Sequence, residues 1–302
     1  QGNVVVDFAV EDDPDQTVFV GHRLGGGIAK IDVDVSGTID LITTTGDLTI
    51  DVASGKTVLV TTAWTVGDNT VTLQGASSTS SVTNGAQVTL DNANSVLAAS
   101  GTITLDDLDL GASATISLND GATLTLTDSI SVGARTLTLK GTTGSLSDTI
   151  TATGGFQLDN ASSVLKIEGD SADPLVVSKV ATGADLTVGK GIDADQSVDI
   201  TTFTVSHNAT LDVATGKTLG GTVTLNAAKT LTLNNIGTVS AIATSTAART
   251  VNVTAAGTIA TLTNGFSGAT VDIDESSTIT TLTPTENVTV STWRSRRTLP
   301  TL

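Results

Sequence analysis

Apolar and polar residues alternate in short segments along most of the chain, and four to six small or polar residues separate one segment from the next. Alternation with a period of two, as in Thr-Leu-Thr-Leu at 123–126, predicts a β-strand with one buried face. The intervening residues are mainly Asp, Asn, Gly, Ala and Ser, which favour turns. The longest helical candidate, 241–248, is rich in Thr and Ala and has no capping pattern, so we interpret it as loop or strand.

Several of these segments recur. Residues 50–58 return at 211–219, residues 88–97 at 156–165, and residues 116–126 at 223–233, with looser copies near Val251 and Val271. The copies begin at irregular intervals, very roughly 12 to 30 residues apart, as in repeat coils with loops of variable length. Strands this short cannot bury enough surface alone, so the units must stack on one another.

Two architectures use many short alternating strands, the antiparallel sandwich and the β-solenoid. A sandwich core normally needs large aromatic side chains, and this chain of 302 residues has five Phe, two Trp and no Tyr. Hairpin dipeptides occur only at 84–85, 120–121 and 264–265, too few for a hairpin at every connection. The predicted fold class is therefore all-β, a parallel β-helix or β-solenoid with irregular coils, and the alternative is antiparallel β-sandwich domains.

The apolar positions of two repeats predict a ladder of aliphatic side chains inside the solenoid. These positions alternate with Thr and Asn, so they should point inward together. They are Leu118, Leu124, Leu126, Leu225, Leu231 and Leu233.

The units at 116–126 and 223–233 resemble the parallel β-helix repeats of bacterial surface and secreted proteins, such as adhesins and autotransporter passengers. The resemblance covers about residues 35–290 and is one of pattern and composition, without a diagnostic motif. It implies an extracellular or cell-surface location and an adhesive or structural role, and it carries over no functional residue. At about 20 residues and 4.8 Å a coil, 12 to 15 coils would form a rod roughly 60 to 70 Å long.

The two ends of the chain depart from the repeat pattern. We expect an N-terminal end region or cap at 1–34, β-solenoid repeats at 35–290 and a basic C-terminal tail at 291–302. The chain begins with Gln, contains no Met and shows no leader, so we expect a mature form or a fragment of a longer protein.

Composition removes several classes of function. The absence of Cys excludes disulfides, thiolate zinc sites and thiol nucleophiles, and only two His are present. The net charge of −17 argues against nucleic-acid binding, and no apolar run approaches the roughly 20 residues that span a membrane. Thr is the dominant residue, with 58 copies. Outward Thr ranks could bind ice if they repeated once per coil, but the irregular coil spacing argues against that function.

Two motifs suggest a phosphate-binding loop and a catalytic histidine, but both are better interpreted as turns. Gly-Lys-Thr at 55–57 and 216–218 matches the end of a phosphate-binding loop, but Ile50 and Leu211 stand where its first Gly is required. His207 lacks a recognisable nucleophile context and is predicted to be a turn residue.

Carboxylate pairs are the residues through which glycosidases act, one as the acid and one as the base. Asp106 and Asp107, followed by Asp109, are the best such pair here. Sugar sites usually offer aromatic platforms and this chain has no Tyr, so we interpret the pair as a solvated strand edge. A polysaccharide-processing β-helix enzyme remains the alternative function.

Acidic turns supply the hard oxygen ligands that calcium prefers. We expect no cofactor other than calcium, and none of the acidic turns matches a known calcium-loop pattern. The candidate ligands are Asp12, Asp13, Asp15, Asp193, Asp195, Asp272, Asp274 and Glu275.

The leading function is a non-enzymatic extracellular structural protein, a β-solenoid rod of a surface layer, fibre or adhesin. The expected partners are a second copy of the chain, bound head to tail, and a cell surface or polysaccharide. Terminal coils expose strand edges that invite another chain. The ends also carry opposite charge, with acidic residues at 11–15 and Arg294, Arg296 and Arg297 near the finish.

Overall fold

The computed structural model describes the solenoid over most of its length. The described residues are 5–7, 29–34, 36–39, 42, 44, 46–84, 87–142, 144, 146–169, 174–226, 229–234, 237–244, 250–253, 258–264, 269–273, 278–284 and 288–292, with the backbone alone for residues 5–7, 29, 78 and 84 and for most strand residues beyond 243. Every helix or strand among them is a β-strand, and every strand pair is parallel. The predicted parallel β-solenoid is confirmed, and the antiparallel sandwich is wrong.

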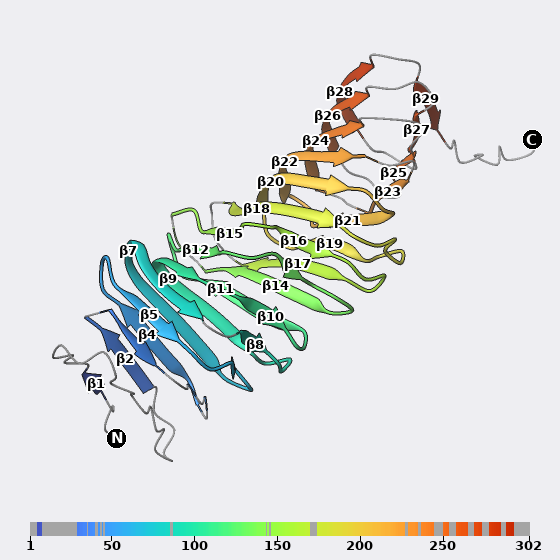
Figure 1. Cartoon of the computed structure of the whole chain (residues 1–302). Helices are drawn as coiled ribbons and strands as arrows, with labels where there is room; N and C mark the ends of the chain where they lie inside the picture. The colour runs from blue at the N-terminus through green and yellow to red at the C-terminus, as the bar shows by residue number, and fades with distance from the viewer. Residues whose placement is uncertain are drawn as a thin grey trace, which may run out of the picture.

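The first face of the solenoid, face A, receives one strand from every coil, and successive coils lie one above another along the rod (Figure 1). Thirteen parallel pairings join its fourteen strands. In stacking order these are β1 (Val5–Asp7), β2 (Ala29–Val33), β4 (Leu48–Val52), β7 (Thr70–Asn84), β9 (Val96–Leu105), β11 (Ala114–Leu118), β14 (Thr136–Gly141), β17 (Val164–Gly169), β19 (Gly191–Ala194), β21 (Ala209–Val213), β23 (Thr230–Leu233), β25 (Thr250–Val253), β27 (Ala269–Ile273) and β29 (Val288–Thr292).

Strands of two further faces, B and C, are described for most coils. Face B contains the second halves of β7 and β9 together with β3 (Gly37–Ile39), β5 (Thr57–Val60), β12 (Thr123–Leu126), β15 (Thr149–Ala152), β18 (Leu175–Thr182), β20 (Val198–Val205), β22 (Thr218–Leu225), β24 (Thr238–Thr244), β26 (Thr258–Asn264) and β28 (Thr278–Pro284). Face C starts as β6 (Trp64–Thr65), β8 (Val88–Leu90), β10 (Leu108–Leu110), β13 (Ile130–Ser131) and β16 (Phe156–Leu158).

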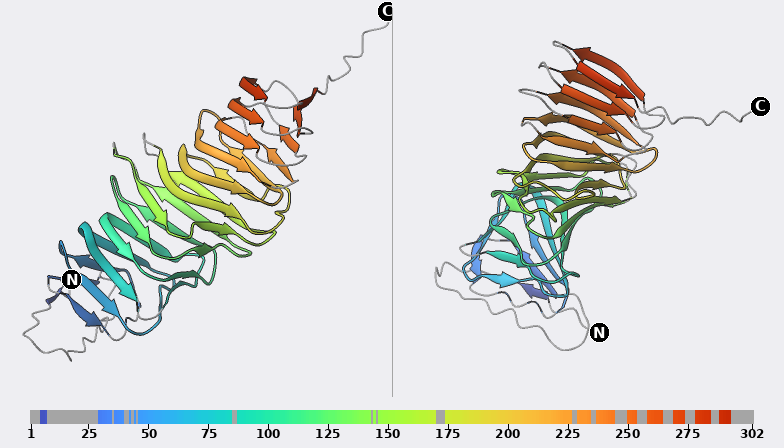
Figure 2. Two further views of the ribbon diagram at one scale, coloured as in Figure 1. Left: turned by 45° about the horizontal axis from the view of Figure 1, so that its top comes forward. Right: turned by 90° about the vertical axis from the view of Figure 1, so that its right-hand side faces the viewer.

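The way in which strands turn the corners changes along the rod. In the N-terminal part β7 and β9 run continuously from face A to face B. From β18 onward a single strand covers faces B and C, with register shifts at the bend between Ile200 and Phe203 and between Leu219 and Thr222. Figure 2 shows the same stack from two other sides.

The coil length is irregular at first and regular later. Paired residues on face A are 19 apart at Lys30 and Thr49 but 28 apart at Thr136 and Val164. From β19 to β29 the separation stays between 19 and 22 residues. Thirteen steps of about 4.8 Å give a rod of roughly 60 Å.

Aliphatic side chains fill the interior coil after coil. Strands such as β4, β11 and β12 alternate buried and half-buried residues, as their sequences predicted. Phe156 and Phe203 are fully buried among them, and Trp64 is nearly so. The six leucines expected to point inward are all buried, with 1% exposure at most.

Some residues assigned to the N-terminal end region belong to the stack. β1 pairs with β2, and β2 pairs with β4 in register from Ala29 to Val33. At the other end β29 extends face A to Thr292.

The corner between faces A and B in β9 depends on a glycine. Gly101 has φ +66°, and a Cβ placed there would lie 2.2 Å from the carbonyl oxygen of Gly75 in the coil beneath. Only glycine permits this conformation and this close stacking together.

Replacing an inward leucine with a charge should destabilise the rod. Leu231→Asp buries an unpaired carboxylate in the ladder and should lower the free energy of unfolding by about 3 kcal/mol or more. The control is Thr232→Asp, which alters a half-buried residue on the opposite side of the same strand. Denaturant unfolding measures both, and equal stability of the two variants would contradict the assigned register.

Gly101→Ala should destabilise more than Gly216→Ala. Gly216 also has a positive φ, +74°, but a Cβ there meets nothing within 4 Å. Its substitution should therefore cost only the backbone strain, roughly 1 to 2 kcal/mol. Gly101→Ala adds the collision with the stacked backbone, so its melting temperature should be clearly the lower of the two. A smaller loss at Gly101 would show that the corner can open.

Candidate functional site

A recurring turn binds neighbouring coils together through side chains. Asp91 Oδ1 accepts a hydrogen bond from Gly67 N at 2.8 Å, and Ser95 Oγ donates to Gly67 O at 2.5 Å. In the second copy Asp159 and Ser163 make the same bonds to Gly133. The repeated sequences 88–97 and 156–165 thus adopt the same structure, and each is hydrogen-bonded to the turn of the coil before it.

Within this unit the polar residues also bond to one another. Asn92 N donates to Ser95 Oγ, and Asn94 N donates to Asn92 Oδ1, each at 3.0 Å. Asn160, Ser162 and Ser163 repeat both bonds at the same distances. These Asp, Asn and Ser residues satisfy backbone groups at the turns, which is a structural use of residues that could otherwise suggest a site.

Other side chains accept backbone N–H groups one coil further on. Asp47 accepts from Thr70, Ser113 from Thr136 and Ser197 from Thr218. The corners lack ladder bonds for some N–H groups, so an oxygen from the adjacent coil replaces the missing carbonyl.

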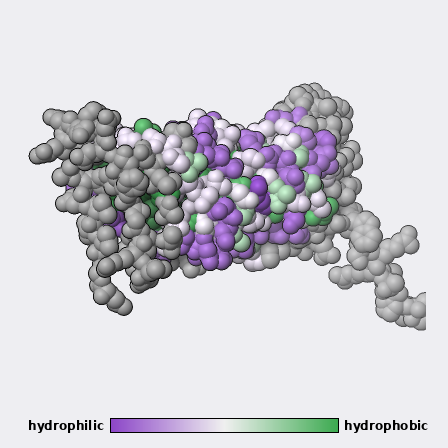
Figure 3. All heavy atoms as spheres, turned by 60° about the horizontal axis from the view of Figure 1, so that its bottom comes forward, coloured by the Kyte–Doolittle hydropathy of each residue, from purple (hydrophilic) through white to green (hydrophobic). Residues whose placement is uncertain are grey.

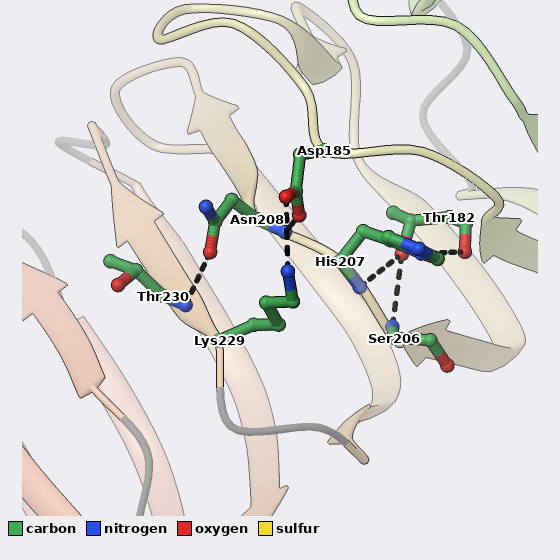
Figure 4. A network of polar contacts seen from close by, with 7 residues as sticks. All are labelled: Thr182, Asp185, Ser206, His207, Asn208, Lys229 and Thr230. Atoms are coloured by element: carbon green, nitrogen blue, oxygen red, sulfur yellow. Dashed lines mark hydrogen bonds and ion pairs between the residues drawn. The ribbon is translucent and has the colours of Figure 1, made fainter.

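The polar network around His207 follows the same rule (Figure 4). Thr182 Oγ1 accepts from the backbone N of Ser206 and of His207, and the His207 ring nitrogen Nδ1 lies 3.0 Å from Thr182 O. His207 lies between β20 and β21, where a turn residue was predicted.

An aspartate and a lysine extend this network across three coils. Asp185 accepts from Asn208 N at 2.9 Å and from Lys229 Nζ at 3.0 Å. These bonds lower the pKa of Asp185, with the Asn208 bond as the largest cause. Asn208 Oδ1 in turn accepts from Thr230 N.

The Gly-Lys-Thr segments form tight turns that lead into strands. Lys56 N donates to Ala53 O and Lys217 N donates to Ala214 O, and β5 and β22 follow directly. A phosphate-binding loop needs a helix at this place, so the structure supports the interpretation as turns.

Two of the predicted calcium ligands, Asp193 and Asp195, lie at the outer surface of face A in a row of charged side chains. Register aligns Lys166, Asp193 and Asp212 on successive coils, and Asp212 accepts a hydrogen bond from Asn234. The ammonium group of Lys166 contacts Glu168 and lies 3.6 Å from Asp195 Oδ2. We name Lys166, Glu168, Asp193, Asp195 and Asp212 the face A charge row.

The electrostatics of the face A charge row show crowding of like charges. Partial burial, and then the neighbouring Asp195, raise the pKa of Asp193, and partial burial raises the pKa of Asp212. The hydrogen bond to Glu168 raises the pKa of Lys166. Lys166 thus supplies, from the protein itself, positive charge of the kind that a bound cation would bring.

Of the other predicted calcium ligands, the structure describes only Asp272. Asp272 lies on β27 in register with Asn252 and Ser291, where only the backbone is described. Asp12, Asp13, Asp15, Asp274 and Glu275 lie outside the described residues, as does His22. Within the part of the chain that is described, no three His, Cys, Asp or Glu side chains are grouped so that they could hold a metal ion.

The pair Asp106 and Asp107 follows β9 at a corner, and the two carboxylates engage opposite coils. Asp106 accepts a hydrogen bond from Thr127 Oγ1 of the next coil. Asp107 Oδ1 lies 3.5 Å from Gln87 Nε2 of the preceding coil. Asp109 lies half-buried on β10 between two buried leucines. These contacts tie the turn to the coils on both sides.

Sequence reasoning missed two charged or polar arrangements. Lys30 bonds to Asp32 on its own strand and to Asp51 on the next coil, and both bonds raise its pKa. Asp148 and Gln196 are polar yet buried, with 2% and 1% exposure. Neither arrangement could be found without knowing the register, because Asp51 contacts Lys30 from another coil, and Asp148 and Gln196 come from different coils.

Comparisons of the chain with protein-family models, with curated proteins and with solved structures gave no match. The described residues also contain no helix long and apolar enough to cross a membrane.

The calcium prediction can be tested against the lysine of the face A charge row. If Asp193 and Asp195 bind calcium, added calcium should raise the melting temperature and a chelator should lower it. Lys166→Gln removes the competing ammonium group and should increase the rise, whereas Lys179→Gln, at an exposed lysine bonded to Thr153 O, should not. A melting temperature that calcium does not change in the wild type, Lys166→Gln or Lys179→Gln would contradict a site in this row.

Proposed function

We propose that this protein is a non-enzymatic structural rod of the extracellular surface, part of a surface layer, fibre or adhesin, that assembles end to end. The observation that carries the proposal lies at the last described coil of face B, where an interior side chain is only partly buried. On face B the interior positions Leu219 and Val239 are fully buried, and Ile259 is 2% exposed. Ile279 continues this ladder one coil further and is only partly buried.

Backbone groups at this end also favour a further coil. Among the described residues β28 pairs only with β26, and β29 only with β27. Strand edges and partly exposed apolar ladders are surfaces to which another strand can add.

At the opposite end the first described strands run parallel to their neighbours, as β28 and β29 do. On faces A, B and C the first described strands are β1, β3 and β6, and each pairs with a strand on one side. A contact between unlike ends is heterologous and does not close, so it produces a filament. The charged segments at 11–15 and 294–297, which would orient such a contact, lie outside the described residues.

The flank of the rod suits an exposed and soluble structural element. Figure 3 shows mostly hydrophilic residues on the described part of one side, with apolar residues scattered among them. The net charge of −17 keeps the flanks of neighbouring rods apart and leaves the ends as the favourable contact. A cell surface or a polysaccharide is the second partner that we expect.

Ile279→Lys should prevent end-to-end assembly and leave the fold intact. The charge would lie where the next copy must pack, at the last described coil of face B. The matched control is Thr280→Lys, which places the same charge on the neighbouring exposed residue. Electron micrographs and sedimentation at low salt should show filaments for the wild type and the control, and monomers for Ile279→Lys.

Deletion of 292–302 extends the same test. The truncated protein should form shorter filaments or none, with an unchanged circular dichroism spectrum. A wild type that stays monomeric at high concentration would refute assembly. Cleavage of acidic polysaccharides that is lost in Asp107→Asn would favour the alternative, a polysaccharide-processing enzyme.

A further inference from the structure

The interior ladder of face A changes character near the middle of the rod. Register places Ala99, Leu118, Gly141 and Gly169 on one inward-facing column in successive coils. In the next coil the paired residues end at Ala194, and Gln196 follows two residues later, at the next inward position. Gly141 and Gly169, on adjacent coils, have no side chains. They leave an interior volume that the side chains of Ala99 and Leu118 fill in the preceding coils.

Two polar side chains occupy this volume. Asp148 is 2% exposed and Gln196 is 1% exposed. The position that a Cβ would take at Gly141 lies 3.0 Å from Asp148 Oδ2 and 3.2 Å from Gln196 Oε1. A Cβ at Gly169 would lie 2.2 Å from the same Gln196 oxygen. The absence of a side chain at Gly141 therefore admits both a carboxyl group and an amide to the core, each close to this glycine.

The surroundings of Asp148 do not stabilise a negative charge on both oxygens. Oδ1 accepts a hydrogen bond from Gly121 N at 2.9 Å, but the buried Oδ2 has no hydrogen-bond partner among the described residues. A buried carboxylate with an unsatisfied oxygen is costly unless a proton or a cation compensates it.

No described basic side chain faces the carboxyl group. The charge that acts on it is another carboxylate, Asp120, in the turn after β11, which itself accepts from Leu146 N. Beside the two glycines, Lys140 and Glu168 alternate to the outer side of face A, and Asp195 beside Gln196 is exposed.

We propose that Asp148 carries a proton in the folded protein and donates it in a hydrogen bond to the Gln196 side-chain oxygen, so that this buried pair is a pH-sensitive latch between coils. The latch holds the corner that leads from β14 to β15. The backbone of this corner is tied to the coils on both sides, because Thr149 N donates to Ala122 O and Val176 N donates to Asp148 O. Ionisation of Asp148 leaves a charge in the core and loosens this corner.

The electrostatics agree in direction. Burial, the largest cause, raises the pKa of Asp148, and the charge of Asp120 adds to the rise, while backbone hydrogen bonds from Gly121, Ala122 and Thr142 oppose it. The folded state thus binds the proton more tightly than the unfolded chain. Its contribution to stability is fully present below the unfolded pKa and is lost as the pH rises from there to the folded pKa.

The test is thermal and denaturant unfolding of the full chain across acidic to neutral pH, with Asp148→Asn as the principal variant. Asn keeps the shape and can donate to Gln196 at every pH. In the window between the two pKa values one proton makes the wild-type unfolding constant rise up to tenfold per pH unit, and Asp148→Asn should lack that component. Asp128→Asn, at an exposed aspartate, is the control and should keep the wild-type dependence.

Carbon-13 NMR titration of the wild-type aspartate carboxyl groups reads the proton directly and does not require the variant to fold. A signal that disappears in Asp148→Asn, or that is assigned through Gly121, should titrate above the ordinary aspartate range. A normal titration midpoint, or equal pH dependence of Asp148→Asn and the wild type, would overturn the proposal. Calcium or sodium that removes the pH dependence would also overturn it, since a cation would then occupy the place of the proton.

Discussion

The stacking of one coil directly on the next is the constraint on which the rest of this structure depends. Parallel strands about 4.8 Å apart place equivalent side chains of successive coils in contact. An inward side chain must therefore pack against similar side chains in the coils on both sides. Val, Leu, Ile and Ala meet this condition, as Ile31, Ile50 and Leu73 show on face A, where each is fully buried. A larger or charged side chain at one such position would disturb at least three coils.

The turns satisfy a second condition, which is that the strands of every coil must lie in register with those of the coil before it, whatever the length of the coil. Coils of 19 and of 28 residues stack equally because loops absorb the difference outside the ladder. Asp, Asn and Ser side chains then satisfy the N–H groups that the corners leave without ladder partners. Asp91 and Asp159, which bond to Gly67 and Gly133, show one solution used twice. This explains why a chain rich in polar residues devotes so many of them to its own backbone.

The requirement that inward side chains stack from coil to coil also explains why two places, where the ladder is incomplete, differ from the rest of the interior. At the C-terminal end Ile279 lacks the full cover that buries Val239, which is the basis for the proposed assembly. Inside the rod Gly141 and Gly169 interrupt the apolar column, and Asp148 and Gln196 enter the space. The first leaves an apolar side chain only partly buried, and the second admits a titratable group to the core.

The amino-acid sequence by itself determined the all-β class, the solenoid and the identity of the inward leucines, because a period of two specifies which face is buried and a scarcity of aromatic side chains favours a narrow interior. Leu118, Leu225 and Leu231 could be assigned on that basis alone. Only the tertiary structure decided the register between coils. It set Lys166 against Asp195, turned Asp106 and Asp107 toward different coils, and brought Asp148 to Gln196 across two glycines. The physical reason is that each of these pairs is about 20 or more residues apart or diverges at a corner, and loop lengths, which no local pattern specifies, determine which residues meet.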